Sequence, residues 1–259
     1  MLEFLEKIQL EIMPLLSGAC LLLVILTLQT KILSPRRRRI LALMQLAAGF
    51  LLIAERAADL AQGNPGETAF WVVRIGNFLV YAMMLFLLFF MNQYLCDLYQ
   101  NEGGMQVLPK RLRVNDILFL AGMLLLLVSQ FTDLYYTVDA NNVYTRAAYQ
   151  PISYIFPMII IFSQMSVVIQ YYHLLPRRIT RSLILFTVLP LIATIIQFFL
   201  YGLYLTDMTV VGMVVVLYLF ALNDLSEAAA KANELEIKHY QDEHRRPLPS
   251  RAVRRPRLS

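Results

Sequence analysis

The sequence predicts an all-α membrane protein, a bundle of seven transmembrane helices that is followed by a C-terminal helix in the cytoplasm. Hydrophobic residues occupy 58% of the 259 positions and charged residues only 16%, whereas charged residues make up about a quarter of a soluble domain. Seven apolar stretches are long enough to cross a bilayer, and basic residues gather in alternate connections between them.

The spans follow from length. A bilayer core of about 30 Å requires roughly 20 apolar residues in a helix. The first stretch is too long for the apolar region of a signal peptide, and no small-residue cleavage site follows it. The expected spans are Ile12–Leu33, Ile40–Ala61, Phe70–Tyr94, Ile117–Tyr136, Ile152–Tyr172, Leu183–Tyr204 and Met208–Leu222.

The basic residues predict the orientation. Most of the 23 Lys and Arg residues follow the first, third, fifth and seventh spans. Loops rich in Lys and Arg stay in the cytoplasm. We therefore expect a protein of the inner (plasma) membrane, with its N-terminus on the outer side and its C-terminus in the cytoplasm. The run Arg36–Arg39 then marks a cytoplasmic turn and a contact for anionic lipids. This placement also accounts for the net charge of +5, so nucleic acid is not an expected partner.

The last span continues into a charged helix, and neither Gly nor Pro interrupts the join. Ala, Leu, Glu and Lys dominate this segment and are strong helix formers. We therefore divide the chain into a transmembrane domain (1–223), a coiled-coil-like cytoplasmic helix (224–246) and a disordered basic tail (247–259) that is rich in Pro and Arg. Apolar residues recur in the helix at steps of three and four, which suits a homodimer.

The sixth span contains a proline, which can bend a helix, and a polar glutamine. Pro190 is expected to kink the span, and Gln197 lies two turns further on. We expect a signal relay that consists of Pro190, Gln197, Asp224, Leu225, Ala228, Ala232 and Leu235. Gln164 and Gln197 are also expected to tie helices together by hydrogen bonds.

Ionisable residues at membrane depth predict the functional site. Glu55, Arg56 and Asp59 in the second span are three and four positions apart and can share one side of a helix. Such residues usually face the bundle interior, where they pair or line a wet cavity. We expect a polar pocket in the outer half, with an internal salt bridge as the alternative. Residue counting adds polar residues of spans three and four, which gives the ligand-binding set Glu55, Arg56, Asp59, Arg74, Asn77, Gln130 and Asp133.

Enzyme motifs are absent from the sequence. It contains no Gly-rich phosphate loop followed by Lys, no His–Glu pair at metalloprotease spacing and no nucleophile elbow. The histidines at positions 173, 239 and 244 are expected at helix ends or in the charged helix. We therefore expect no catalytic residue, metal site or cofactor.

Four segments carry a family resemblance: RIGNFLVY, FTDLYYTVDANNVYTR, LPLIATIIQFFLYG and ALNDLSEAAAKANELEIKHYQDEHRR. With these segments the chain resembles the seven-helix N-terminal sensor modules of bacterial signalling proteins, whose C-terminal parts are HD-GYP phosphodiesterases, GGDEF diguanylate cyclases or histidine kinases. The resemblance implies a sensor in cyclic-di-GMP or phosphorelay signalling that acts on a cytoplasmic signalling enzyme. The catalytic motifs of these output domains are absent, so their activity does not carry over.

Two further readings remain open. A small-solute transporter or channel subunit would also place ionisable residues within the membrane. A membrane enzyme that acts on lipids is the least favoured, because cytoplasmic His, Asp and Cys residues do not cluster. The basic end, in place of an output domain, also leaves open a truncated or frameshifted product.

Overall fold

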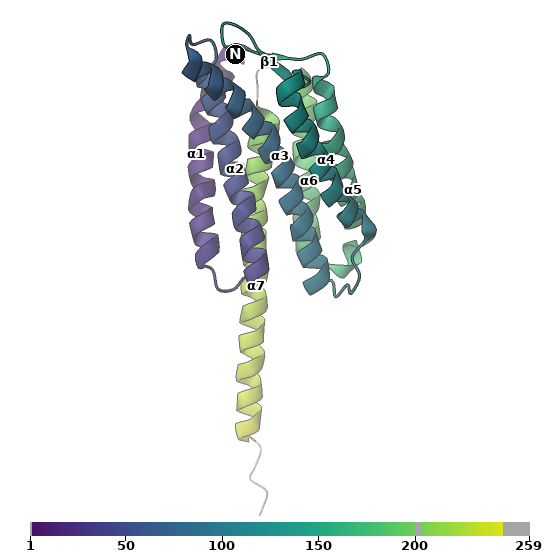
Figure 1. Cartoon of the computed structure of the whole chain (residues 1–259). Coiled ribbons are helices and arrows are strands. Elements are labelled where there is room, and N and C mark those ends of the chain that lie inside the picture. Colours follow the sequence, from purple (N-terminus) through teal and green to yellow (C-terminus); the bar gives the residue numbers. More distant parts are fainter. Residues whose placement is uncertain (1, 200–203, 246–259) are drawn as a thin grey trace, which may run out of the picture.

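The computed structural model describes residues 2–199 and 204–245. For residues 2–7, 198, 199, 224, 225, 228, 231, 232 and 239–245 it describes the backbone alone. The described residues form an all-α bundle with seven helices long and apolar enough to cross a membrane (Figure 1). The chain is therefore a multi-pass membrane protein.

Each predicted span lies within or overlaps a helix. The helices are α1 (Leu2–Gln29), α2 (Pro35–Ala61), α3 (Glu67–Asn101), α4 (Lys110–Thr132), α5 (Ile155–Gln170), α6 (Arg177–Phe199) and α7 (Leu205–Arg245). The shorter elements are β1 (Tyr136–Val138), β2 (Tyr144–Arg146) and the 3-10 turns η1 (Gln150–Tyr154) and η2 (Tyr172–Leu174).

The fourth span ends earlier than predicted. We expected it to reach Tyr136, but α4 ends at Thr132 because Asp133 has a left-handed backbone with φ of 50°. Tyr136 instead begins the antiparallel hairpin of β1 and β2, in which it is paired with Arg146. Aromatic apolar residues at the end of a span therefore formed a cap over the bundle rather than more helix.

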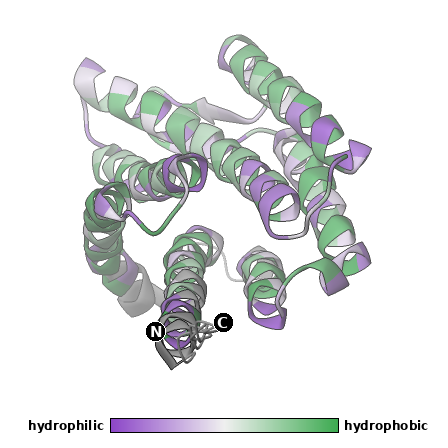
Figure 2. Cartoon of the chain, turned by 90° about the horizontal axis from the view of Figure 1, so that it is seen from below, coloured by the Kyte–Doolittle hydropathy of each residue, from purple (hydrophilic) through white to green (hydrophobic). Residues whose placement is uncertain are grey.

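The hairpin distinguishes one end of the bundle from the other. We call the end with β1 and β2 the hairpin end and the opposite end, where α7 continues beyond the other helices, the tail end (Figure 1). Helix α2 packs against α1, α3 and α7, and α6 also packs against α7. Seen from the tail end, hydrophobic residues predominate along the helices of the bundle (Figure 2), as a lipid-facing surface requires.

Helix α7 is a single helix of 41 residues from Leu205 to Arg245. Its candidate membrane span ends at Asn223, and the rest extends away from the bundle (Figure 1). The backbone of the predicted relay positions 224, 225, 228 and 232 belongs to this helix, but their side chains lie outside the description. The predicted tail, 247–259, also lies outside the described residues.

Helices α2 and α3 approach closely at Gly76. A Cβ at this position would lie 2.9 Å from the backbone oxygen of Ala54 and 2.9 Å from the Cβ of Ala58. Both distances are shorter than van der Waals contact, so only a hydrogen atom fits between the helices. Helices in a membrane associate largely by van der Waals packing, because lipid is as apolar as their side chains. Small residues such as Gly76 allow the backbones to approach closely enough for this packing.

The substitution Gly76→Ala should therefore destabilise the bundle by about 1–3 kcal/mol, because α2 has to move away from α3. The measurement is chemical unfolding in detergent. Gly212→Ala on α7 is the control, since no atom lies within 4 Å of a Cβ built there. Equal stability of the two variants would contradict the close approach.

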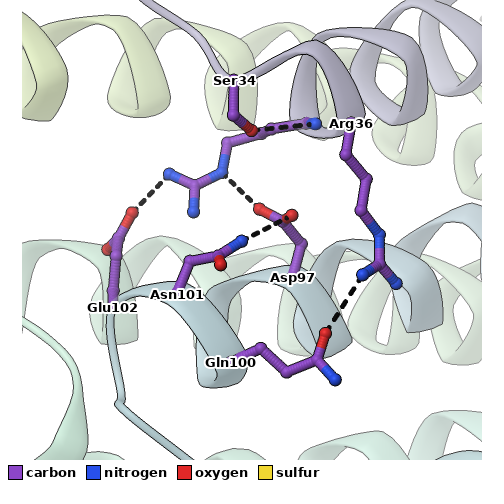
Figure 3. A network of polar contacts seen from close by, with 7 residues as sticks. Ser34, Arg36, Asp97, Gln100, Asn101 and Glu102 are labelled. Atoms are coloured by element: carbon purple, nitrogen blue, oxygen red, sulfur yellow. Dashed lines mark hydrogen bonds and ion pairs between the residues drawn. The ribbon is translucent and has the colours of Figure 1, made fainter.

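At the tail end, Arg37 joins the start of α2 to the end of α3. Figure 3 labels its partners Asp97 and Glu102 and the neighbouring Asn101. Its Nε lies 2.8 Å from the carboxylate of Asp97, and a second nitrogen pairs with Glu102. Asn101 donates a further hydrogen bond to Asp97 at 2.9 Å. The Arg37 and Asp97 side chains are 7% and 0% exposed. The run Arg36–Arg39 was expected to contact anionic lipids, but Arg37 is buried as an ion-pair partner.

The change Arg37→Ala should cost about 3–5 kcal/mol, because it leaves the Asp97 charge buried without its cation. The double substitution Arg37→Met with Asp97→Leu should recover part of this loss, since it removes both charges. Unfolding midpoints in detergent report both effects. The exposed neighbour Arg39→Ala is the control, and a loss as large as that of Arg37→Ala would refute the special role of Arg37.

Candidate functional site

A cavity of about 1060 Å³ extends from the hairpin end into the bundle. It has a mixed lining of polar, aromatic and aliphatic side chains, as ligand pockets of small molecules commonly do. All seven helices contribute to it, together with the hairpin. The lining includes Gln9, Glu55, Asp59, Asn77, Tyr81, Tyr135, Tyr144, Arg146, Tyr154, Pro190, Thr194, Gln197, Tyr204, Thr206, Asp207 and Val210.

Two buried carboxyl groups face one another in this cavity. Glu55 of α2 is 8% exposed and Asp207 of α7 is 7% exposed, and their carboxyl groups lie within hydrogen-bonding reach of each other. The Oε2 atom of Glu55 has no hydrogen-bond partner among the described residues. Among the residues whose side chains are described, no Lys, Arg or His forms an ion pair with Glu55 or Asp207.

A third carboxyl, that of Asp59, lies one turn further along α2. It accepts a hydrogen bond of 2.6 Å from the hydroxyl of Tyr204, which directly precedes α7. Burial, together with the negative charge of Asp59, raises the pKa of Tyr204 above its ordinary value of 10.0. The phenol therefore remains a hydrogen-bond donor at neutral pH.

The first turn of α7 is held by three other helices. The backbone N–H of Tyr204 donates to Gln9 of α1 at 3.0 Å. The N–H of Thr206 donates to the side-chain oxygen of Gln197 on α6 at 2.8 Å, and its hydroxyl donates to Thr194 at 3.2 Å. The two backbone bonds use N–H groups that a helix start leaves without intrahelical partners. The bond from the Tyr204 hydroxyl to Asp59 adds a contact with α2.

Tyr81, Tyr135 and Tyr144 line the cavity at the hairpin end, and Tyr136 packs on Tyr81. The rings of Tyr81 and Tyr136 stack with centroids 5.9 Å apart, and the hydroxyls of Tyr81 and Tyr144 lie 3.1 Å apart. Burial raises the pKa of Tyr144 above its ordinary value, and it raises the pKa of Tyr135 and that of Tyr136 to about 12. The hairpin therefore places neutral aromatic groups over the cavity.

The structure brings three of the seven predicted ligand-binding residues to the cavity: Glu55, Asp59 and Asn77. Asn77 donates to the backbone oxygen of Val73 in its own helix at 2.8 Å. The carboxyls of α2 face inward because the same face of that helix meets α7.

The other four predicted residues do not line the cavity. Arg74 donates to the backbone oxygen of Gln130 and lies over the ring of Phe70, with 5.9 Å to the centroid. The side chain of Gln130 accepts from Tyr136 at 3.1 Å.

Arg56 and Asp133 take no part in these hydrogen bonds. Arg56 has a buried Nε without a hydrogen-bond partner among the described residues. Asp133 is exposed at the end of α4. Arg74 and Gln130 thus form a contact between α3 and α4 that is separate from the cavity lining.

Asp207, Tyr204 and Gln9 were missed by sequence reasoning. We assigned Asp207 to the connection before a span that was expected to begin at Met208, but α7 begins at Leu205. An acidic residue just before an apolar stretch is a signal for the first turn of a helix, and this signal could have found Asp207. Gln9 carries no such signal. Of the predicted relay, Pro190 lines the cavity and Gln197 contacts the start of α7.

Comparison of the chain with protein-family models, with curated proteins and with solved structures finds no match. Within the described residues, no group of three or more His, Cys, Asp or Glu side chains is arranged to hold a metal ion. The chemistry that the arrangement offers is that of carboxylates and tyrosines around a cavity large enough for a small organic molecule.

The buried tyrosines at the hairpin end predict alkaline sensitivity. An unfolded chain loses tyrosine protons near pH 10, whereas folded Tyr135 and Tyr136 keep theirs until about pH 12. Stability is therefore complete below pH 10 and falls as pH rises from 10 to 12. Each substitution, Tyr135→Phe or Tyr136→Phe, should reduce this slope by about 1.4 kcal/mol per pH unit. Unfolding in detergent at several alkaline pH values measures the slope, and the neutral-pH value controls for lost hydrogen bonds. An unchanged slope in both variants would contradict the prediction.

Proposed function

We propose that the chain is a membrane-embedded sensor that binds a ligand in the cavity and transmits the binding event through α7. One observation carries the proposal: the helix that supplies Thr206, Asp207 and Val210 to the cavity continues without a break to Arg245. A change at the first turn of α7 is therefore passed directly to the segment that leaves the bundle.

The geometry favours a rigid-body response of α7. Its first turn contacts α1, α2 and α6 through side chains that also line the cavity. A ligand that displaces any of these contacts changes the position of the helix start. From Asn223 to Arg245 the helix extends roughly 33 Å at 1.5 Å per residue, so a small tilt becomes a larger displacement at its end.

The basic residues support an orientation in the inner membrane with the tail end on the cytoplasmic side. In this orientation the hairpin end of the cavity lies toward the outer side and the extended part of α7 reaches the cytoplasm. Leu235 and Ile237 on that part are 67% and 58% exposed, which suits pairing with a second copy or docking on a cytoplasmic signalling enzyme. The resemblance to bacterial sensor modules agrees with this role.

A small-solute transporter or channel subunit is the second candidate. The carboxyls of Glu55 and Asp207 at membrane depth favour it, because proton- and ion-coupled transporters place such groups near their substrate. This candidate requires solute flux across proteoliposomes that Glu55→Gln abolishes. The sensor requires movement of α7 and no flux.

The sensor proposal predicts that a change in the cavity moves the distant end of α7. In a chain with Cys20 and Cys96 replaced by Ala, spin labels at Lys31→Cys and Leu235→Cys report the distance between the α1–α2 turn and the extended helix. Adding Asp207→Asn should shift this distance distribution in nanodiscs, because it changes the contact between α7 and α2. The same distribution with and without the substitution would contradict the proposal.

Two controls belong to this experiment. Asp116→Asn makes the same chemical change on α4, at a carboxyl that does not line the cavity and accepts from Asn92, and it should leave the distance unchanged. Gly at both Ala229 and Ala230, within the segment 224–233, should broaden the distribution and remove its response to Asp207→Asn, because glycine weakens a helix.

A further inference from the structure

We infer that the ligand of the cavity is a protonated organic amine, whose ammonium group lies between Glu55 and Asp207. The inference rests on the proposed ligand-binding role of the same cavity and adds the chemical class of the ligand.

Hydrogen-bond donors are scarce around these two carboxyl groups. Carboxylates only accept hydrogen bonds, so Glu55 and Asp207 can bond each other only when one of them carries a proton, and an outside donor can take the place of that proton. The Oε2 of Glu55 is a buried acceptor without a partner among the described residues, although Glu55 lines the cavity. An ammonium group has three N–H donors and a positive charge, so one group satisfies both carboxyls.

The carboxyl groups of Glu55 and Asp207 have no cationic side chain as an ion-pair partner among the described residues. Burying a carboxylate without a compensating cation is costly, and the described residues place no cationic side chain in an ion pair with Glu55 or Asp207. The hydroxyl of Tyr204 is directed at the third carboxyl, Asp59, at 2.6 Å. Glu55 and Asp207 therefore remain as the two acceptors for a bound cation.

The size and lining of the cavity suit an organic cation. At about 1060 Å³ it is far larger than a proton or a small inorganic cation requires. Tyr81, Tyr135, Tyr144 and Tyr154 line it in addition to aliphatic side chains. Aromatic faces attract cations and pack on organic groups, so the lining fits an amine that carries an apolar body.

Arg146 also lines the cavity, on the hairpin strand β2. Its position beside Tyr81 and Tyr144 would suit a carboxylate on the ligand, and a zwitterionic amino acid is therefore the main competitor. The amine is preferred because the buried Oε2 of Glu55 has no donor among the described residues, and the amino acids are tested beside the amines.

The experiment measures binding to the full chain in nanodiscs near neutral pH. The probes are primary amines from methylamine to phenethylamine and tryptamine, the alcohols of the same carbon skeletons, the amino acids phenylalanine and tryptophan, and sodium chloride alone. At least one amine should raise the thermal midpoint and bind about tenfold or more tightly than its alcohol, since a hydrogen bond to a charged group is involved. Amines that bind no better than their alcohols would overturn the inference, and so would tighter binding of the amino acids or an equal effect of sodium.

Substitutions then locate the site. Glu55→Gln and Asp207→Asn should each weaken binding of the best amine about tenfold or more, whereas Asp116→Asn should leave it unchanged. Glu55→Asp keeps the charge and should retain part of the affinity, which separates a charge effect from a folding defect; the thermal midpoint without ligand checks folding. Unaltered affinity in both carboxamide variants would overturn the assignment. If amines fail to bind but Asp207→Asn still shifts the spin-label distance, only the ligand class is wrong, whereas failure of both results rejects the sensor as well.

Discussion

The contact between the first turn of α7 and the carboxyl face of α2 is the interaction on which the rest of this structure depends. It joins the last helix to the second through Asp207 and Glu55, and the Tyr204–Asp59 bond lies beside it. Burying acidic groups in a membrane protein is costly, so a contact of this kind is hard to explain by stability alone. The amine ligand that we propose would supply a positive charge to these buried carboxyl groups.

The two ends of the bundle differ in how firmly they are built. At the tail end, Arg37 is an internal counterion for Asp97 and Glu102, and this pairing fixes α2 to α3. At the hairpin end, the contacts of α7 are single hydrogen bonds to side chains that also line the cavity. A bundle that is pinned at one end and adjustable at the other can turn binding into motion of one helix without losing its fold. The closely packed Gly76 adds to the rigid part.

The sequence was sufficient for the seven spans because length and hydropathy determine them. It also indicated Glu55, Asp59 and Asn77, since polar residues at membrane depth usually face inward. It could not show which arginine of Arg36–Arg39 turns inward, because that depends on Asp97 of a distant helix. Other cavity residues, such as Gln9, meet the site only through tertiary packing. The first residue of the hairpin, Tyr136, was assigned to the end of the fourth span because a tyrosine is apolar enough for either place.

The continuity of α7 favours the proposed sensor over a transporter. A transporter has to open its site alternately to both sides, and its broken helices usually lie at the site. Here the helix that carries Asp207 is unbroken from the cavity to Arg245, and the firm Arg37 contact lies at the end that would have to open. The same continuity that would hinder alternating access is what a relay needs. The long helix is therefore better explained as a lever moved by the cavity than as one wall of a pathway through the membrane.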